Sequence, residues 1–187
     1  MTARVTIRAA ALGLALLAGA VASAAAQEAG EIQIVEHGIY TAEVESTVRE
    51  PSGIGRNIVT NICHIATTTT VPAKYGIHFG LRYRIVGPPM GELVDLKKVV
   101  VFPQPLKPPT APRPVTTYEY PVRLAVGTVT YTGYSFDHPW EFAPGPWTMQ
   151  IWQGNRRLSE LVFDVVEGKD APTPRTGNET CFKISSL

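Results

Sequence analysis

The chain lacks a large excess of charge of either sign, which narrows the classes of partner it can have. It contains 187 residues, with 17 Lys and Arg against 16 Asp and Glu, for a formal net charge of +1. A protein that gathers nucleic acid or an anionic membrane through its overall field needs a strongly charged surface. The composition therefore predicts no nucleic-acid partner.

Cysteine is also scarce, because only Cys63 and Cys181 are present. Neither lies in a C-x-x-C motif, and the pair Cys63-His64 alone is a poor signature of a nucleophile. In an oxidising compartment, two cysteines are typical of one structural disulfide. We therefore predict a Cys63–Cys181 bridge that ties the polar C-terminal tail back onto the domain. A thiol site is the alternative.

The N-terminal segment is typical of a secretory signal peptide. Arg4 and Arg8 form a positive n-region, an uncharged apolar run follows, and Ala24 and Ala26 satisfy the small-residue rule for cleavage before Gln27. The uncharged run from residue 9 to residue 26 is near the lower limit for a bilayer span, so a membrane anchor is the alternative. We expect cleavage, an exported protein in the periplasm or secreted, and no membrane span in the mature chain.

Helical periodicity is missing after residue 26, and alternation with period two dominates. In the segment 74–85 every odd position is apolar or aromatic, whereas the even positions include Lys74, His78, Arg82 and Arg84. This pattern predicts a strand of an antiparallel sheet with one packed and one solvated face. Further strands are expected over residues 32–40, 42–48, 57–70, 94–102, 115–120, 125–134, 146–152 and 156–165.

Seven or eight short strands with Pro- and Gly-rich turns favour an all-β protein with an antiparallel β-sandwich of immunoglobulin-like or fibronectin-like topology; a barrel is the alternative. Six of the twelve residues from 103 to 114 are proline, which predicts a surface crossover between strands. We expect residues 1–26 as signal peptide, 27–168 as the sandwich, and 169–187 as the tail.

Three sequence blocks resemble a family of exported bacterial proteins that is known only as a domain of unknown function. They are the segments 35–40, 71–87 and 138–152, and the strand at 157–163 is similar to that family as well. The resemblance covers most of the mature chain and implies export and a sandwich fold. It implies no catalytic residues, because the family has no established activity.

Motifs for metal binding and hydrolysis are absent from the sequence. No histidine is paired with another His or Cys at ligand spacing, and adjacent residues such as Cys63 and His64 point to opposite faces of a strand. The segment 133–137 begins like a nucleophile elbow but lacks the closing glycine and the helix. We therefore predict no metal and no cofactor, and an enzyme is less favoured than a binding protein.

The solvated face of the strand at 74–85 is the candidate binding surface. His78, Arg82 and Arg84 would form a basic strip for an anionic group, with Trp152 as an exposed aromatic platform. An ordinary solvated face is the alternative. The sequence thus favours a non-catalytic exported binding or interaction module, whose partner is an envelope protein or a small anionic ligand. A hydrolase with unrecognised carboxylates and a structural envelope protein are the other hypotheses.

Overall fold

The computed structural model describes residues 30–87, 89–168 and 180–182, and this part of the chain is built from strands with one short 3-10 turn at Pro139–Glu141. The strands are β1 (Glu31–Arg49), β2 (Gly55–Ala66), β3 (Thr70–Ala73), β4 (His78–Val86), β5 (Leu93–Leu106), β6 (Val115–Ala125), β7 (Thr130–Ser135), β8 (Gly145–Gln153), β9 (Arg156–Glu167) and β10 (Thr180–Phe182).

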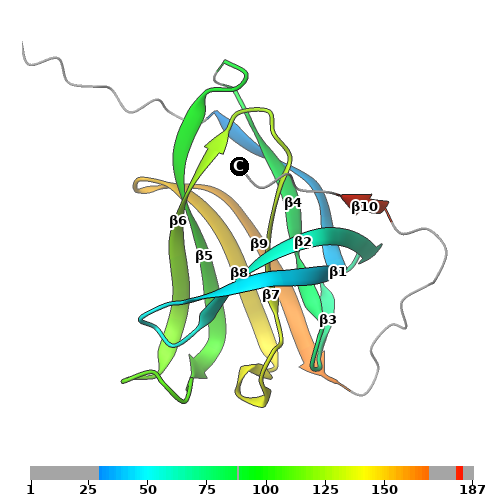
Figure 1. Cartoon of the computed structure of the whole chain (residues 1–187), viewed down its shortest axis with the longest axis vertical. Coiled ribbons are helices and arrows are strands. Elements are labelled where there is room, and N and C mark those ends of the chain that lie inside the picture. Colours follow the sequence, from blue (N-terminus) through cyan, green and yellow to red (C-terminus); the bar gives the residue numbers. More distant parts are fainter. Residues whose placement is uncertain (1–29, 88, 169–179, 183–187) are drawn as a thin grey trace, which may run out of the picture.

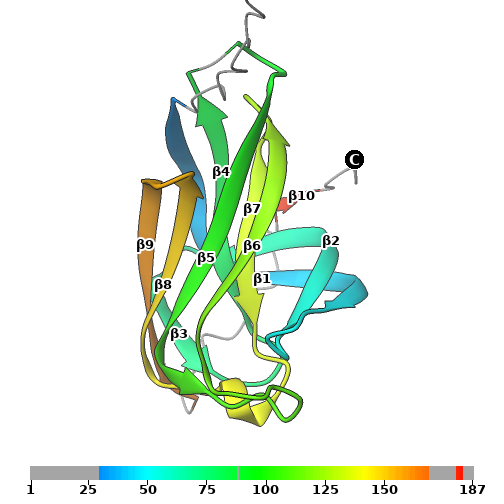
Figure 2. The same ribbon diagram turned by 90° about the vertical axis from the view of Figure 1, so that its left-hand side faces the viewer.

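The strands form two five-stranded sheets that pack face to face (Figures 1 and 2). One sheet has the order β10-β2-β1-β4-β7 and the other the order β3-β9-β8-β5-β6. All pairings are antiparallel except that of β3 with β9. The expected all-β sandwich is therefore confirmed, and it contains more strands than expected.

The interior follows the predicted alternation. In β4 the odd positions from Phe79 to Ile85 are at most 1% exposed and face the second sheet. Around Phe79 an aromatic cluster fills the space between the sheets, with ring centroids 5.2–5.8 Å from those of Phe136, Trp147 and Phe163. Trp147 is completely buried, and its indole N–H donates to the carbonyl of Ala143. This cluster is the apolar core of the sandwich.

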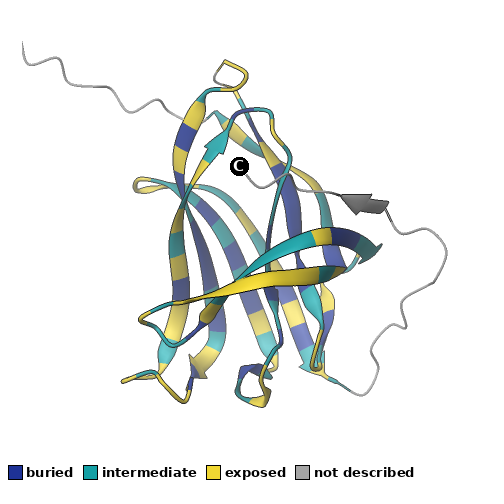
Figure 3. Cartoon of the chain, viewed as in Figure 1, coloured by how far each residue is buried: buried dark blue, intermediate teal, exposed yellow. Residues whose placement is uncertain are grey.

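Strand β1 is one long strand rather than the two expected, and it changes partners along its length. Residues 31–40 pair with β4, whereas residues 41–49 pair only with β2. Three register shifts between residues 39 and 46 bend the ribbon, as β-bulges do. Residues 41–49 of β1 and 55–62 of β2 form a hairpin, here called the arm, that crosses the other strands in Figure 1. The β1 side of the arm is mostly exposed (Figure 3).

One glycine is required at the base of the arm. Gly38 has φ of +140°, and a Cβ atom there would collide with the carbonyl oxygen of Ala66 in β2. A residue with a side chain would push β1 and β2 apart at this point. The close approach of the two strands at Gly38 thus sets where the ribbon turns away from the sheet.

The proline-rich segment departs from expectation. β5 continues through Pro103 and Pro105 to Leu106, so only the residues after it form a crossover. β6 then begins at Val115, and the pairing of β5 with β6 is irregular between Val101 and Leu106. Prolines are tolerated here because the regular ladder is interrupted. The signal peptide expected over 1–26 and most of the tail at 169–187 lie outside the described residues.

A tyrosine-lined cavity beneath the arm

A cavity of about 230 Å³ lies between the edge strands β6 and β7, where β2 of the arm covers the side of the sandwich. These two strands end their respective sheets, so the side between them is not closed by hydrogen bonding. Among the residues lining the cavity are four tyrosines: Tyr118 and Tyr120 from β6, and Tyr131 and Tyr134 from β7. The wall is thus aromatic with polar edges.

Lys98 of β5 also lines the cavity, and it is only 7% exposed. It occupies an inward-facing position of the strand, in phase with the buried residues Leu96 and Val100. Its ammonium donates a hydrogen bond of 2.8 Å to the carbonyl oxygen of Tyr131. Burial, with a smaller contribution from the nearby Arg56, lowers the pKa of Lys98 to about 8.

Two aromatic rings lie near the ammonium of Lys98. The rings of Tyr83 and Tyr120 have their centroids 5.8 Å from the nitrogen, within the range of a cation–π interaction. No ion pair to a carboxylate is formed by Lys98 among the residues that the structure describes. The charge is therefore stabilised by dipoles and rings alone.

Two tyrosine hydroxyls in this region are buried without a hydrogen-bond partner. They belong to Tyr83 and to Tyr118, and the second of these tyrosines lines the cavity. Burial raises the pKa of both hydroxyls, so they remain neutral donors at physiological pH. An unsatisfied buried hydroxyl costs about 1–3 kcal/mol, which a bound acceptor would recover.

The other charged groups of the cavity are occupied. Arg56 of the arm donates to Glu50 at 3.1 Å and lies over the ring of Tyr120, with 5.2 Å between its Cζ atom and the ring centroid. The Asp137 carboxylate accepts from Asn57 at 2.7 Å and from Ser135 at 2.8 Å. These contacts also fasten the arm to β6 and to the end of β7.

Glu141 is a buried acid with a structural role. Its carboxylate accepts hydrogen bonds from the Tyr134 hydroxyl and from the backbone N–H groups of Asp137 and His138, at 2.6–2.8 Å. Burial raises its pKa, and these hydrogen bonds partly oppose the increase. They hold the 3-10 turn against β7, which shapes this end of the cavity.

His78, Ser135 and Asp137 lie together at the cavity, but their arrangement does not match a catalytic triad. Ser135 is opposite His78 in the ladder, yet its hydroxyl donates to Asp137 instead of the imidazole. A triad needs the histidine between the hydroxyl and the carboxylate. Burial lowers the pKa of His78, opposed by the Asp137 charge. The three side chains therefore form part of the polar rim of the cavity.

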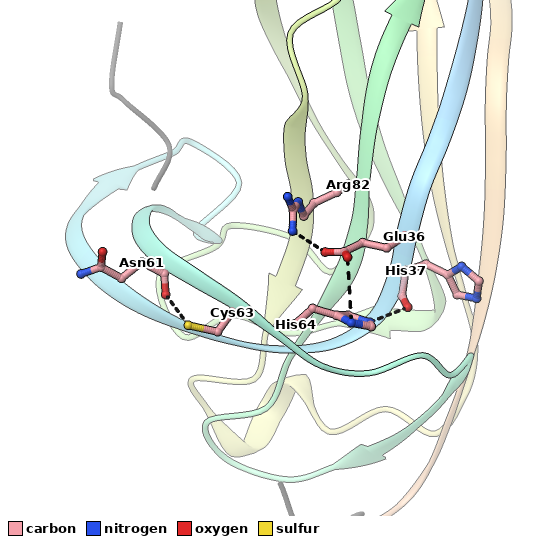
Figure 4. Close-up of polar contacts among 6 residues, drawn as sticks. All are labelled: Glu36, His37, Asn61, Cys63, His64 and Arg82. Atoms are coloured by element: carbon pink, nitrogen blue, oxygen red, sulfur yellow. Dashed lines mark hydrogen bonds and ion pairs between the residues drawn. The ribbon is translucent and has the colours of Figure 1, made fainter. Parts of the chain in front are cut away.

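The structure separates the residues of the expected basic strip. Arg82 was expected in solvent, but it is 6% exposed and donates to the Glu36 carboxylate at 2.6 Å (Figure 4). His64 extends this cluster, with 4.0 Å between its Nδ1 atom and Glu36. The exposed Arg84 donates to Gln33 at 2.6 Å. The prediction that Arg82 faces solvent is wrong, because Glu36 of β1 pairs with its guanidinium and His64 of β2 lies next to Glu36.

The remaining two residues of that prediction lie apart from each other. His78 lines the cavity, whereas Trp152 lies in β8 of the other sheet. The Trp152 indole is half-buried and donates to the side chain of Gln150. Gly80 of β4 allows the backbone of β7 to approach closely, because a Cβ atom there would meet the Thr132 carbonyl.

The two cysteines of the predicted disulfide occupy opposite positions on neighbouring strands. Cys63 in β2 and Cys181 in β10 are directly opposite in the antiparallel ladder. Cα atoms of opposite residues in such a ladder are about 4.5–5.5 Å apart, within the range that a disulfide spans. The pairing of β10 with β2 therefore brings a short piece of the tail to the base of the arm.

Within residues 30–87, 89–168 and 180–182, no three His, Cys, Asp or Glu side chains gather in a way that would hold a metal ion. No helix in the described part of the chain is long and apolar enough to cross a membrane.

Lys98 and the tyrosines around it were not singled out by the sequence reasoning. A signal was present, because Val94, Leu96, Val100 and Phe102 share one phase of the strand and Lys98 interrupts it. A lysine in the buried phase of a strand marks either an edge or a site. The contribution of the arm could not be inferred, since it depends on the bend of β1.

Comparison with known proteins identifies a family, and solved structures include a similar protein. The family model described as a domain of unknown function, DUF3859, matches residues 28–165. An immunoglobulin-like protein from Pseudomonas aeruginosa, solved as a crystal structure, is 27% identical with a TM-score of 0.52. The match covers 75% of this chain and all of that one. No curated protein matches the sequence.

Proposed function

We propose that this chain, which belongs to the DUF3859 family and has an immunoglobulin-like fold, is a non-catalytic binding module. Its ligand site is the cavity beneath the arm. The observation that carries this proposal is the buried Lys98 ammonium in a tyrosine-lined cavity. Concave sites with apolar walls and a few convergent polar groups are the usual form of small-molecule sites. Packing alone would favour an apolar residue at this position.

The size of the cavity limits the ligand. A volume of about 230 Å³ suits a small organic molecule, about the size of one substituted aromatic ring. Arg56 and Asn57 reach from the arm to Tyr120 and Asp137, so they close the site on two sides. A larger ligand would require the arm to move away from β6 and β7.

A titration by NMR tests whether this cavity binds small molecules. Benzoate, benzyl alcohol and benzylamine are added separately to the ¹⁵N-labelled protein, and we expect at least one to shift the amide resonances of Asn57 and Thr132. Val122 lines the cavity, so Val122→Phe should fill it and reduce the shifts. Val162→Phe, at an exposed position of β9, is the matched control. Absence of shifts at the cavity with all three probes would contradict the proposal.

We also propose that the module works outside the cytoplasm, after cleavage before Gln27, and that a Cys63–Cys181 disulfide fastens the tail. The signal-like leader and the opposed cysteines support this. Intact-mass analysis of the exported protein should give a chain beginning at Gln27, and alkylation without reductant should label neither cysteine. A full-length membrane-bound chain would contradict export, and ready labelling of both cysteines would contradict the bridge.

A further inference from the structure

We infer that the ligand of the cavity is a small organic carboxylate with an apolar ring or chain, and that Lys98 is the residue that binds the carboxylate. This inference rests on the proposed function, since it identifies the chemistry of the same site. It is carried by a buried cation without a counter-ion among the described residues, by an unsatisfied donor in the same cavity, and by the aromatic wall around them.

The buried charge of Lys98 points to a negatively charged ligand. A buried ammonium is costly unless it is paired, and Lys98 has one hydrogen bond to a carbonyl and two rings nearby. Each carboxylate lining the cavity is already held by protein donors. Asp137 has Asn57 and Ser135, while Glu141 has the Tyr134 hydroxyl and two backbone N–H groups. The missing negative charge would therefore come from a ligand.

The unused hydrogen-bond donors of Lys98 and Tyr118 suit a ligand group that only accepts. A lysine ammonium has three protons, so Lys98 retains two after its bond to Tyr131. The Tyr118 hydroxyl lines the same cavity and has no partner. A carboxylate only accepts, and its two oxygens provide about four acceptor sites. A group of this kind would satisfy unused donors without leaving a donor of its own buried.

The single ammonium and the apolar wall also limit the rest of the ligand. A single ammonium suits one negative charge, and Arg56, which would add the second cation for a phosphate, is engaged by Glu50. The tyrosine rings and Val122 offer apolar area that inorganic anions do not use. The chemistry thus favours an organic monoanion, with benzoate as a probe of suitable size.

Binding of matched probes tests the choice of charge. Dissociation constants are measured by NMR titration for benzoate, benzyl alcohol, benzylamine and inorganic phosphate. We expect benzoate to bind about 10- to 100-fold more tightly than benzyl alcohol, because hydrogen bonds to a charged group are the stronger ones. Equal affinities of the two would overturn the inference while leaving the cavity as a binding site. Tighter binding of benzylamine or of phosphate would overturn it as well.

Two lysine variants test the role of Lys98. Lys98→Met keeps the length of the side chain and removes the charge, so benzoate affinity should fall about 10-fold or more while that of benzyl alcohol changes little. Lys97→Met is the matched control, since Lys97 is the neighbouring residue, is half-exposed and pairs with Glu119 outside the cavity. Unchanged benzoate affinity in a folded Lys98→Met protein would overturn the assignment.

A pH titration of the unchanged protein tests the inference without a substitution. The groups facing Lys98 are Arg56 from β2, Tyr83 from β4, and Tyr120 and Tyr131 from β6 and β7. Burial raises the pKa of all three tyrosines, so Lys98 is the group of this set that titrates near pH 8. Benzoate affinity should fall as the pH rises from 8 to 10, whereas benzyl alcohol affinity stays constant. A flat benzoate profile would overturn the inference.

Discussion

Two regions of the molecule bury their residues by different means. One is the interior between β4, β8 and β9, and the other is the side beneath the arm. Between the sheets, Phe79, Trp147 and Phe163 are completely buried and contact one another through ring edges and faces. Outside this core, the buried groups are the Lys98 ammonium in the cavity beneath the arm and the Arg82 guanidinium beside Glu36, together with tyrosine hydroxyls. The first region is closed by apolar contact, and the second depends on polar contacts that its own residues complete only in part.

This contrast separates the region that stabilises the fold from the region that we propose to bind a ligand. Aromatic packing gains free energy from apolar area removed from water and needs no partner. A buried charge without a counter-ion costs stability and is expected where function requires it. The arm adds the polar region to an otherwise ordinary sandwich, because β1 bends and brings β2 over the side between β6 and β7. The predictions below test this difference.

The largest effect is expected in the apolar core. Phe79→Ala would remove a ring that lies 5.2–5.8 Å from those of Phe136, Trp147 and Phe163. Such a change typically costs about 3–5 kcal/mol, from lost transfer energy and the cavity left behind. Urea denaturation should show this loss. A cost below about 1 kcal/mol would mean that the core is not closed as described.

The next effect concerns the buried ion pair on the outer face of β4. Arg82→Ala would leave the Glu36 carboxylate without its 2.6 Å partner and should lower the free energy of unfolding by about 2–3 kcal/mol. Arg84→Ala is the control two residues along the strand, with an expected cost below about 0.5 kcal/mol because this residue is exposed. Similar costs for both would indicate that Arg82 and Glu36 do not form a buried pair.

The third effect is a pH dependence that only the polar region produces. The pKa of Lys98 is about 8 when folded and about 10.5 when unfolded, so the unfolded chain holds more protons between these values. Stability should therefore rise with pH, by about 2 kcal/mol from pH 8 to pH 10. Urea denaturation at pH 8, 9 and 10 measures it, with Lys98→Met as the reference. The same slope in both proteins would contradict the burial of a charged Lys98.

The sequence predicted the apolar region better than the polar one for a physical reason. Alternation along a strand is local, so the buried odd positions of β4 and the strands 146–152 and 156–165 could be read directly. The position of Lys98 in the buried phase of β5 was visible in the same way. Its role could not be inferred, because that role depends on the strands that pack against β5. Local patterns therefore identified the inner faces of the sheets and the class of fold.

The bend of β1 was not visible in the same way. Nothing in the sequence of residues 41–49 and 55–62 indicates that they cross β7, as they do in Figure 1. The prediction that Arg82 faces solvent was wrong because the alternation identifies the outer face of a sheet but not the side chains, here Glu36 of β1, that pack against a residue on that face. The cavity shares this origin, since its walls come from several separate segments between residues 55 and 141.

The smallest effect should come from the contact that fastens the arm. Asn57→Ala removes the hydrogen bonds to Asp137 and Ser135, of 2.7 and 3.1 Å, and should cost about 1 kcal/mol of stability. Hydrogen exchange should quicken at the amides of β2 over residues 55–60 but not in β8, because the arm loosens while the apolar core stays intact. Gln150→Ala, which removes an exposed bond to Glu160 and the bond from the Trp152 indole, is the control and should leave exchange in the arm unchanged. Unchanged exchange in the Asn57→Ala arm would mean that Arg56 and Tyr120 alone hold it. Faster exchange in both β2 and β8 would show that the two regions unfold together, and the contrast between them would then apply to composition and not to stability.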